Sequence, residues 1–385
     1  MRMFKSQRGF TLLELLVASS IGLTVILVMT SLFKVGMDAT IRVTQRAETQ
    51  QNVRAAIQLM TKDISLAGAG LPSGGLQLGT AGLSKFACNQ TGTCYVTGGT
   101  YPNSGGGAAN YMYPIEPGFA VGVQNGAVIP AAPGQINSSI TTVYCDYNFP
   151  LTNFRFTFPG STSANVAVIN GGVTPNNILA PGGLQVGDLL LFQVSVPSNG
   201  AAGNPNGNSL VQTAAVVAEI TGIPNNTSIN FNTGDALNFN FSTGSNNLAS
   251  VAGASGVANA QTNVCRLQVV SYFLQVPAAG GTVQQPRLMR QVNGLNAVPV
   301  ADGIINLQFT YDVIDTLNGT VVANQQNPIG AGESPSLIQK VNIWIMGSSL
   351  TTNGNRSQSM YLATSVATRD MSFCNSYSSS TTSCQ

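Results

Sequence analysis

"RGFTLLELLVA", residues 8–18, opens a run of apolar residues that contains one acidic side chain, Glu14. From Phe10 to Phe33 no other residue is charged. A helix of this length reaches about 36 Å at 1.5 Å per residue, which exceeds the roughly 30 Å of a bilayer's hydrocarbon core. The stretch therefore predicts a membrane-spanning helix. Because an ionised acid in such a helix is costly, Glu14 is a candidate functional residue.

The residues before the helix predict its orientation. Arg2, Lys5 and Arg8 favour a cytoplasmic leader and an exported head. A secretory signal peptide is one alternative, and "VAS" at 17–19 has the small residues of a cleavage site. However, the apolar run continues past that point, and a signal peptide has no use for a carboxylate. A simple membrane anchor is the other alternative, and it gives no reason for Glu14.

The helix is predicted to continue beyond the membrane. No proline occurs between Lys34 and Ala67, and "GAGLPSGG" from Gly68 then supplies glycine and proline that end a helix. A single helix from Phe10 to Ala67 would measure about 87 Å. Apolar residues recur at helical spacing in its second half, which predicts a face packed on a globular head: Val53, Ile57, Met60, Ile64 and Ala67.

"QRGFTLLELLVA" resembles the class III signal of type IV pilins and type II secretion pseudopilins. A basic leader ends at Gly9, Phe10 follows, and Glu14 takes the fifth position of the processed chain. The resemblance implies that a prepilin peptidase cuts between Gly9 and Phe10 and that the new amine of Phe10 is methylated. It also implies that Glu14 neutralises the Phe10 amine of a neighbouring subunit inside a filament, where the low dielectric strengthens the attraction.

Within that superfamily the chain most resembles the PilW-type minor pilins and the related J-type minor pseudopilins. The residues that carry this likeness are "ETQQNVRAAIQLMTKDISLAGAG" at the helix end and, near the C-terminus, "RLMRQVNG", "VADGIINLQFTYDV", "KVNIWIMGSS" and "YLATSVATRD". We expect an α+β fold, with a long helix on a large, mainly antiparallel β-rich head. The expected parts are a leader (1–9), a membrane or filament-core half-helix (10–33), an amphipathic half-helix (34–67) and the head (70–385), with loop-rich insertions at about 75–260.

The head is predicted to consist of β-strands, because it contains apolar runs bounded by Gly, Asn and Pro. In "GIINLQFTYDV" (303–313) apolar residues from Ile305 onward alternate with polar ones, which predicts a strand with one face in water. Trp344, the only tryptophan, lies in "KVNIWIMG", where we expect a covered central strand and core packing. "NFNTGDALNFNF" from Asn230 lacks the acids of a calcium loop and is interpreted as a hairpin that turns near Thr233 and Gly234.

The even number of cysteines suggests disulfides in an oxidising compartment. Short spacings favour two local pairs, and the remaining two cysteines then pair over a long loop. The alternative is metal binding, but neither short pair has C-x-x-C spacing and no histidine can complete a ligand set. The expected pairs are Cys88 with Cys94, Cys374 with Cys384, and Cys145 with Cys265.

The composition excludes several functions. Only 8 % of the 385 residues are charged, and no basic block follows the N-terminus, so nucleic acid is not an expected partner. The chain has no histidine, which rules out Ser-His-Asp and Cys-His sites. We found no Walker A motif, no complete dinucleotide motif and no nucleophile elbow. We therefore expect no enzyme activity, no cofactor and no metal.

The leading hypothesis is a minor pilin that starts or caps a type IV pilus. Its head would be exported from a single-pass inner-membrane precursor and would end in a filament on the cell surface. The resemblance implies as partners the prepilin peptidase, membrane lipid before assembly, an inner-membrane assembly platform, other major and minor pilins and, as a further candidate, a large tip adhesin. The alternatives are a minor pseudopilin of a type II secretion system and an adhesive or DNA-uptake subunit.

Overall fold

The structure is a computed structural model of the 385-residue chain. It describes residues 9–72, 75–78, 85–86, 95–96, 111–119, 138–169, 173–197, 210–235, 237–241, 247–256, 260–275, 286–315, 317–326, 335–349 and 359–368.

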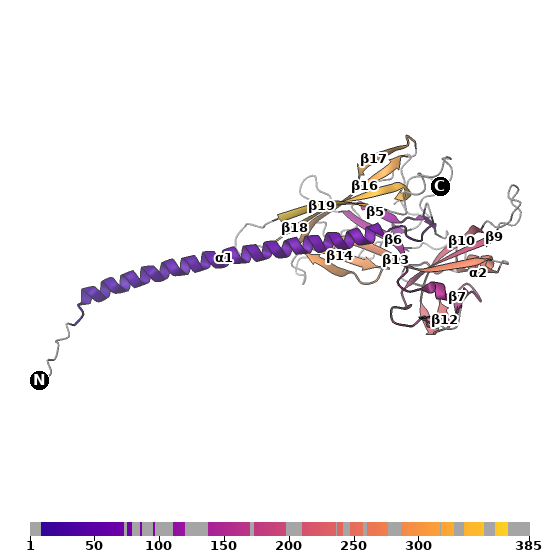
Figure 1. The fold of residues 1–385 in the computed structure, drawn as a ribbon, viewed down its shortest axis with the longest axis horizontal. Helices are drawn as coiled ribbons and strands as arrows, with labels where there is room; N and C mark the ends of the chain where they lie inside the picture. Colours follow the sequence, from indigo (N-terminus) through magenta and orange to yellow (C-terminus); the bar gives the residue numbers. More distant parts are fainter. Residues whose placement is uncertain are drawn as a thin grey trace.

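A single helix, α1 (Leu12–Ser65), projects from a β-rich head, and the N-terminus lies at its far end (Figure 1). Residues 12–44 extend beyond the described contacts with the head, a length of about 50 Å at 1.5 Å per residue. The head is built from antiparallel strand pairs throughout its described part. The expected α+β fold, a long apolar helix on an antiparallel head, is therefore confirmed.

The end of α1 packs on a four-stranded sheet of order β17-β16-β18-β19. The residues of its apolar stripe are buried in one core with the inward side chains of this sheet. Gly347 lets the two approach, because a Cβ there would lie 2.6 Å from Cγ2 of Val53. The strands are β16 (Ile304–Asp315), β17 (Thr320–Gln325), β18 (Ile338–Ser348) and β19 (Ser359–Ala367), and η3 (Pro335–Leu337) precedes β18.

Two details of this sheet differ from the sequence prediction. The register shifts between Ile304 and Asn306, so Ile304 is fully buried and Ile305 is only half-buried. Strand β18 is central, as expected, but no described element covers Trp344 with a second layer. Trp344 is half-exposed on the outer face, since α1 covers only the inner face of the sheet.

The larger sheet has seven strands, and β13 connects its two ends. Residues Gln261–Leu267 of β13 pair with β9, while Arg266–Tyr272 pair with β6 and Val270–Gln275 with β14. One strand therefore runs from the distal end of the head to the core beneath α1. The strands are β5 (Ile115–Phe119), β6 (Ser138–Asp146), β9 (Leu189–Pro197), β10 (Leu210–Glu219), β13 (Gln261–Gln275), β14 (Arg287–Val292) and β15 (Val298–Asp302).

The distal end of the head has its own hydrophobic core, although the sequence predicts loop-rich insertions at about 75–260. Phe192 lies at its centre, with its ring edge-on to Phe156 and Phe231. A four-stranded sheet and α2 surround this core. Its elements are η2 (Leu151–Asn153), β7 (Phe154–Thr157), β8 (Ser163–Val168), β11 (Gly222–Asn225), β12 (Ser228–Asn230) and α2 (Leu248–Ser255). Two short pairs complete the described part: β1 (Leu76–Gln77) with β4 (Tyr111–Met112), and β2 (Lys85–Phe86) with β3 (Tyr95–Val96).

The hairpin expected within 230–241 is wrong. Strand β12 forms its hairpin with the preceding β11, and the residues after it are irregular. The carboxylate of Asp235 instead accepts backbone hydrogen bonds from Phe239 and Asn240 at 2.7 and 3.0 Å. This local side-chain bonding satisfies backbone groups that a second strand would otherwise have paired.

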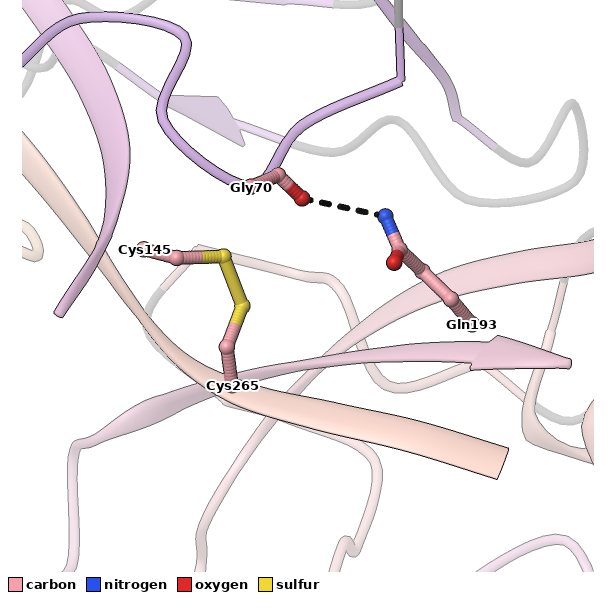
Figure 2. Close-up of a disulfide and its surroundings, with 4 residues drawn as sticks. All are labelled: Gly70, Cys145, Gln193 and Cys265. Atoms are coloured by element: carbon pink, nitrogen blue, oxygen red, sulfur yellow. Dashed lines mark hydrogen bonds between the residues drawn. A yellow bond between two sulfur atoms is a disulfide. The ribbon is translucent and has the colours of Figure 1, made fainter. Parts of the chain in front are cut away.

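A disulfide joins Cys145 of β6 to Cys265 of β13, whose Cα atoms are 5.7 Å apart (Figure 2). This confirms the predicted long-range pair, which spans 120 residues. In the chain-entropy model such a loop contributes about 4–5 kcal/mol to stability. The chain leaving α1 passes beside it at Gly70, which has φ +74° and whose added Cβ would lie 2.7 Å from Sγ of Cys145. Cys88, Cys94, Cys374 and Cys384 lie outside the described residues.

A row of polar side chains crosses the larger sheet on the face directed away from α1. Glu116, Thr141, Ser271 and Gln291 are register neighbours on β5, β6, β13 and β14, and all are buried. Oε1 of Glu116 accepts the backbone N–H of Tyr113 at 2.8 Å, whereas Oε2 has no partner in the described part of the chain. Burial therefore raises the pKa of Glu116 well above its ordinary value, opposed only in part by the Tyr113 bond.

We expect Glu116→Gln to stabilise the protein at neutral pH. In the folded chain the Glu116 carboxyl stays protonated to a higher pH than in the unfolded chain. The stability that Glu116 contributes is therefore fully present below the unfolded pKa of about 4.3, and it is lost as the pH rises toward the raised folded pKa. The Glu116→Gln variant does not lose stability in this way, because glutamine does not ionise. Its advantage in unfolding free energy should grow by about 1.4 kcal/mol per pH unit above pH 4.3, until the folded pKa is reached. Denaturant titrations at pH 4, 5.5 and 7 measure this difference, and a difference independent of pH would contradict it. Glu48→Gln, at an exposed acid on α1, is the control.

Candidate assembly site

The predicted cleavage site lies just before α1, at its exposed end. Gly9 and Phe10 are exposed, and Phe10 is 87 % accessible. A Cβ added at Gly9 would meet no atom within 4 Å, so the chain's own packing does not require glycine there. The peptide bond between Gly9 and Phe10 is therefore accessible to an enzyme.

Glu14 lies one turn into α1 and forms a capping box with Thr11. The Thr11 hydroxyl accepts the backbone N–H of Glu14 at 3.3 Å, and Oε2 of Glu14 accepts the backbone N–H and the hydroxyl of Thr11 at 3.0 and 3.1 Å. These bonds satisfy backbone donors that a helix start otherwise leaves unpaired. The pattern Thr-x-x-Glu is readable in the sequence, but our sequence analysis did not use it. Thr11 is thus a site residue that it missed.

The capping box leaves part of the Glu14 carboxylate available. Among the described residues, Oε1 accepts no hydrogen bond, because all three capping interactions use Oε2 or the Thr11 hydroxyl. A negative charge is also favourable at a helix N-terminus, since it faces the positive end of the helix dipole. The arrangement can therefore hold an ionised carboxylate in place and offer one oxygen to an ammonium group from outside the chain.

The first half of α1 presents apolar side chains on every side. The helix is long and apolar enough to cross a membrane, and none of its most apolar window is buried in the chain. Apolar surface of this extent is normally covered by lipid or by other protein. The most exposed of these side chains, beside Phe10, are Leu12, Leu13, Leu15, Met29, Leu32, Phe33, Val35 and Val43.

The other end of α1 is held to the head by a buried carboxylate. Asp63 is 2 % exposed, and Oδ2 accepts hydrogen bonds from the Tyr272 hydroxyl at 2.6 Å and from Nε of Arg290 at 2.9 Å. Oδ1 accepts the Tyr144 hydroxyl at 3.1 Å. The three donors come from β13, β14 and β6, so one helix residue is tied to three strands of the larger sheet.

Electrostatics explain why Asp63 needs these partners. An acid in the last turn of a helix faces the negative end of its dipole, and Arg290 compensates for this. Burial and then the charge of Asp63 raise the pKa values of Tyr144 and Tyr272, which keeps both hydroxyls protonated as donors. Burial opposes the charge on Arg290, but its bond to Asp63 raises its pKa overall. In the sequence Asp63 stands out only as part of the motif at the helix end, and none of its partners could be predicted because they lie at least 81 residues away.

Glu14 and the Cys145–Cys265 pair, both candidates from the sequence, do not lie together in one site. Glu14 and the Cys145–Cys265 disulfide are at opposite ends of α1, so neither of the two described cysteines lies near the assembly residues. In the part of the chain that the structure describes, no three His, Cys, Asp or Glu side chains are grouped as metal ligands. The site residues Gly9, Phe10, Thr11 and Glu14 therefore form one exposed unit at the start of a bare apolar helix.

Asp63→Asn is expected to destabilise the junction of helix and head. The change leaves Arg290 mostly buried without its counter-charge, and we expect the free energy of unfolding to fall by about 3 kcal/mol. Denaturant titration of the purified chain in detergent measures the loss. Asp38→Asn makes the same chemical change on the projecting part of α1 and should alter stability little. Equal stability of the two variants would mean that the Asp63 bonds do not hold the helix.

Comparison with known protein families places a motif on this same segment. Residues 4–30 match the prokaryotic N-terminal methylation motif. Comparison with curated proteins and with solved structures gives no significant match. A motif of this kind is typical of pilin-type proteins, which are processed by a prepilin peptidase and assemble with other pilins. With the long apolar helix it is consistent with membrane anchoring. The match supports a place for the chain among the type IV pilin-like proteins and pseudopilins.

Proposed function

We propose that the chain is a minor pilin, cut by prepilin peptidase between Gly9 and Phe10 and methylated at Phe10, that helps to start or cap a type IV pilus. The main support for the proposal is the match to the methylation motif over residues 4–30. Most of this segment belongs to an apolar helix, and the most apolar part of that helix is not buried in the chain. Lipid covers that half before assembly, and neighbouring pilin helices cover it in the filament. Glu14 is then the contact for a neighbour's Phe10 amine.

The geometry at Glu14 supports this role. Its carboxylate is held by Thr11 through Oε2, while Oε1 accepts no hydrogen bond from the described residues. Cleavage creates an ammonium at Phe10, and packing of helices places both charges in a medium of low dielectric. An unpaired charge there is costly, so only a subunit that pairs both groups enters the filament without that cost.

The size of the head supports a low-copy position. Beyond the α1-packed sheet the chain adds a distal unit with its own hydrophobic core, so the head is long as well as broad (Figure 1). A bulky head is difficult to repeat in a densely packed shaft, whereas an end of the filament has room for it. Quantitative mass spectrometry of purified pili tests this point, and a stoichiometry equal to that of the principal subunit would contradict it.

A minor pseudopilin of a type II secretion system is the second candidate, because the methylation motif serves both classes. Gene neighbourhood separates them: genes for pilus assembly support the first, and genes for a secretion channel support the second. The expected partners also differ between the two candidates. In the pilus case they are the inner-membrane assembly platform and other minor pilins, or a large tip adhesin.

Gly9→Val is expected to block processing without disturbing the fold. An added side chain at Gly9 meets nothing within 4 Å in the chain, so its effect reports on recognition by the peptidase. Intact-mass measurement of the membrane fraction should show the precursor with residues 1–9 retained. Gly22→Ala, at another open glycine near the N-terminus, should be processed normally. A wild-type N-terminus at any residue other than Phe10 would contradict the signal assignment.

Glu14→Gln separates the charge of Glu14 from its capping bonds. Glutamine serves equally at this position of a capping box, so the helix start is kept while the negative charge is lost. We expect Glu14→Gln and Glu14→Ala both to be processed and both to be depleted at least about tenfold from purified pili, as measured by immunoblot against the membrane pool. If Glu14→Gln enters filaments normally, Glu14 acts only as a helix cap.

A further inference from the structure

The outer face of the α1-packed sheet carries two aromatic side chains that the proposed assembly role does not use. Trp344 of β18 and Tyr361 of β19 are stacked, with ring centroids 6.2 Å apart and ring planes at 26°. Tyr361 is 69 % exposed and Trp344 is half-exposed. Large aromatic rings lose apolar contact when they face water, and a stacked pair with one exposed and one half-buried ring is therefore a candidate binding surface.

A hollow of about 470 Å³ lies beside Trp344 on this sheet. Its volume is within the range of small-molecule sites. None of the described residues that line it is charged, and most are amides or hydroxyls that can both donate and accept hydrogen bonds. The polar residues of this lining that share the outer face with Trp344 are Gln308, Thr310, Asn324, Asn342 and Ser365.

The amides next to the aromatic pair are held in position. Nδ2 of Asn342 donates to Oδ1 of Asp312 at 2.9 Å, and the backbone N–H of Asn324 donates to the same oxygen at 3.0 Å. Oδ2 of Asp312 is paired with Nζ of Lys340 at 2.8 Å. The charges of Asp312 and Lys340 therefore compensate each other beside the hollow. The described lining of the hollow is thus neutral, with Trp344 beside amides that are already held in position.

We propose that this outer face binds a neutral carbohydrate. A sugar ring has an apolar C–H face that stacks on aromatic rings, and hydroxyl groups around its edge that pair with amides and hydroxyls. Trp344 and Tyr361 supply the stacking surface, and Gln308, Asn342 and their neighbours supply the hydrogen bonds. The neutral lining offers no cation to an anionic ligand such as a phosphate or an acidic sugar, so charge complementarity selects an uncharged one.

The position of the face suits contact with an external glycan, a point that rests on the proposed function. The inner face of this sheet packs on α1 through Val53, Ile57 and Met60. When α1 lies among the other helices in a filament, the opposite face is directed outward. The binding itself does not depend on filament assembly and is measured on the isolated chain.

Trp344 provides a direct readout, because it is the only tryptophan in the chain. The purified full chain, in a detergent without a sugar head group, is titrated with a panel of neutral mono- to tetrasaccharides built from glucose, galactose, mannose and N-acetylhexosamines. We expect a saturable change in tryptophan emission with at least one of them and saturation-transfer NMR signals from its ring protons. No saturable response to any sugar of the panel would overturn the proposal.

Three variants locate the binding. Tyr361→Ala removes an exposed ring and should weaken affinity at least about tenfold, and Gln308→Leu should weaken it while keeping the side-chain volume. Tyr147→Ala, at an exposed tyrosine near the disulfide, should leave affinity unchanged. Equal affinity of Tyr361→Ala and wild type would overturn the assignment of the site. A Trp344 signal that follows protein concentration instead of sugar would also overturn it and would identify a protein interface.

Failure here and failure of the proposed function are distinguishable. A chain that enters pili but binds no sugar contradicts only the carbohydrate site, whereas a chain that binds sugar but is absent from pili contradicts only the minor-pilin role.

Discussion

The carboxylate of Asp63 is the interaction on which the arrangement of helix and head depends. It is buried near the end of a 54-residue helix and is held by side chains from β6, β13 and β14. Each donor is oriented by its own strand, so the helix end has one position relative to the larger sheet. A long helix acts as a lever, because a small rotation at Asp63 becomes a large displacement at Glu14. A buried, fully bonded junction is therefore what a rigid projecting helix requires.

Strand β13 extends this junction to the rest of the head. Its second half lies beneath α1, where Tyr272 contacts Asp63, and its first half pairs with β9 in the distal part of the same sheet. The disulfide from Cys265 to Cys145 lies where the two halves meet, close to Gly70 in the chain that leaves α1 (Figure 2). Helix, proximal core and distal core are thus joined within a few residues of one strand. The distal unit is accordingly tied to the same strand that anchors the helix.

Much of the fold could be predicted from residue patterns, because those patterns are local. Val53, Ile57, Met60 and Ile64 mark a helix face by their spacing, and all four are buried on the head. Cys145 and Cys265 could be paired once the short cysteine pairs were set aside. Trp344 shows the limit of this reasoning. Its neighbours Ile343 and Ile345 made the run look apolar on both faces, yet Lys340 and Asn342 alternate with Trp344 on the face that α1 leaves bare. The composition of a strand gives only the number of its apolar residues, whereas the alternation of apolar and polar residues indicates which of its faces is covered.

The sequence by itself determined the N-terminal helix of the protein. A basic leader, Gly9, Phe10, Glu14 and a long apolar run predict a processed membrane helix, because processing signals and helix propensity act over short stretches of chain. The tertiary structure decided what lies far apart in sequence: the three partners of Asp63, the distal core around Phe192, and the exposed pair of Trp344 and Tyr361. Each depends on the register of paired strands and on which sheet face the helix covers, and these are set by packing of the whole chain and not by any one segment.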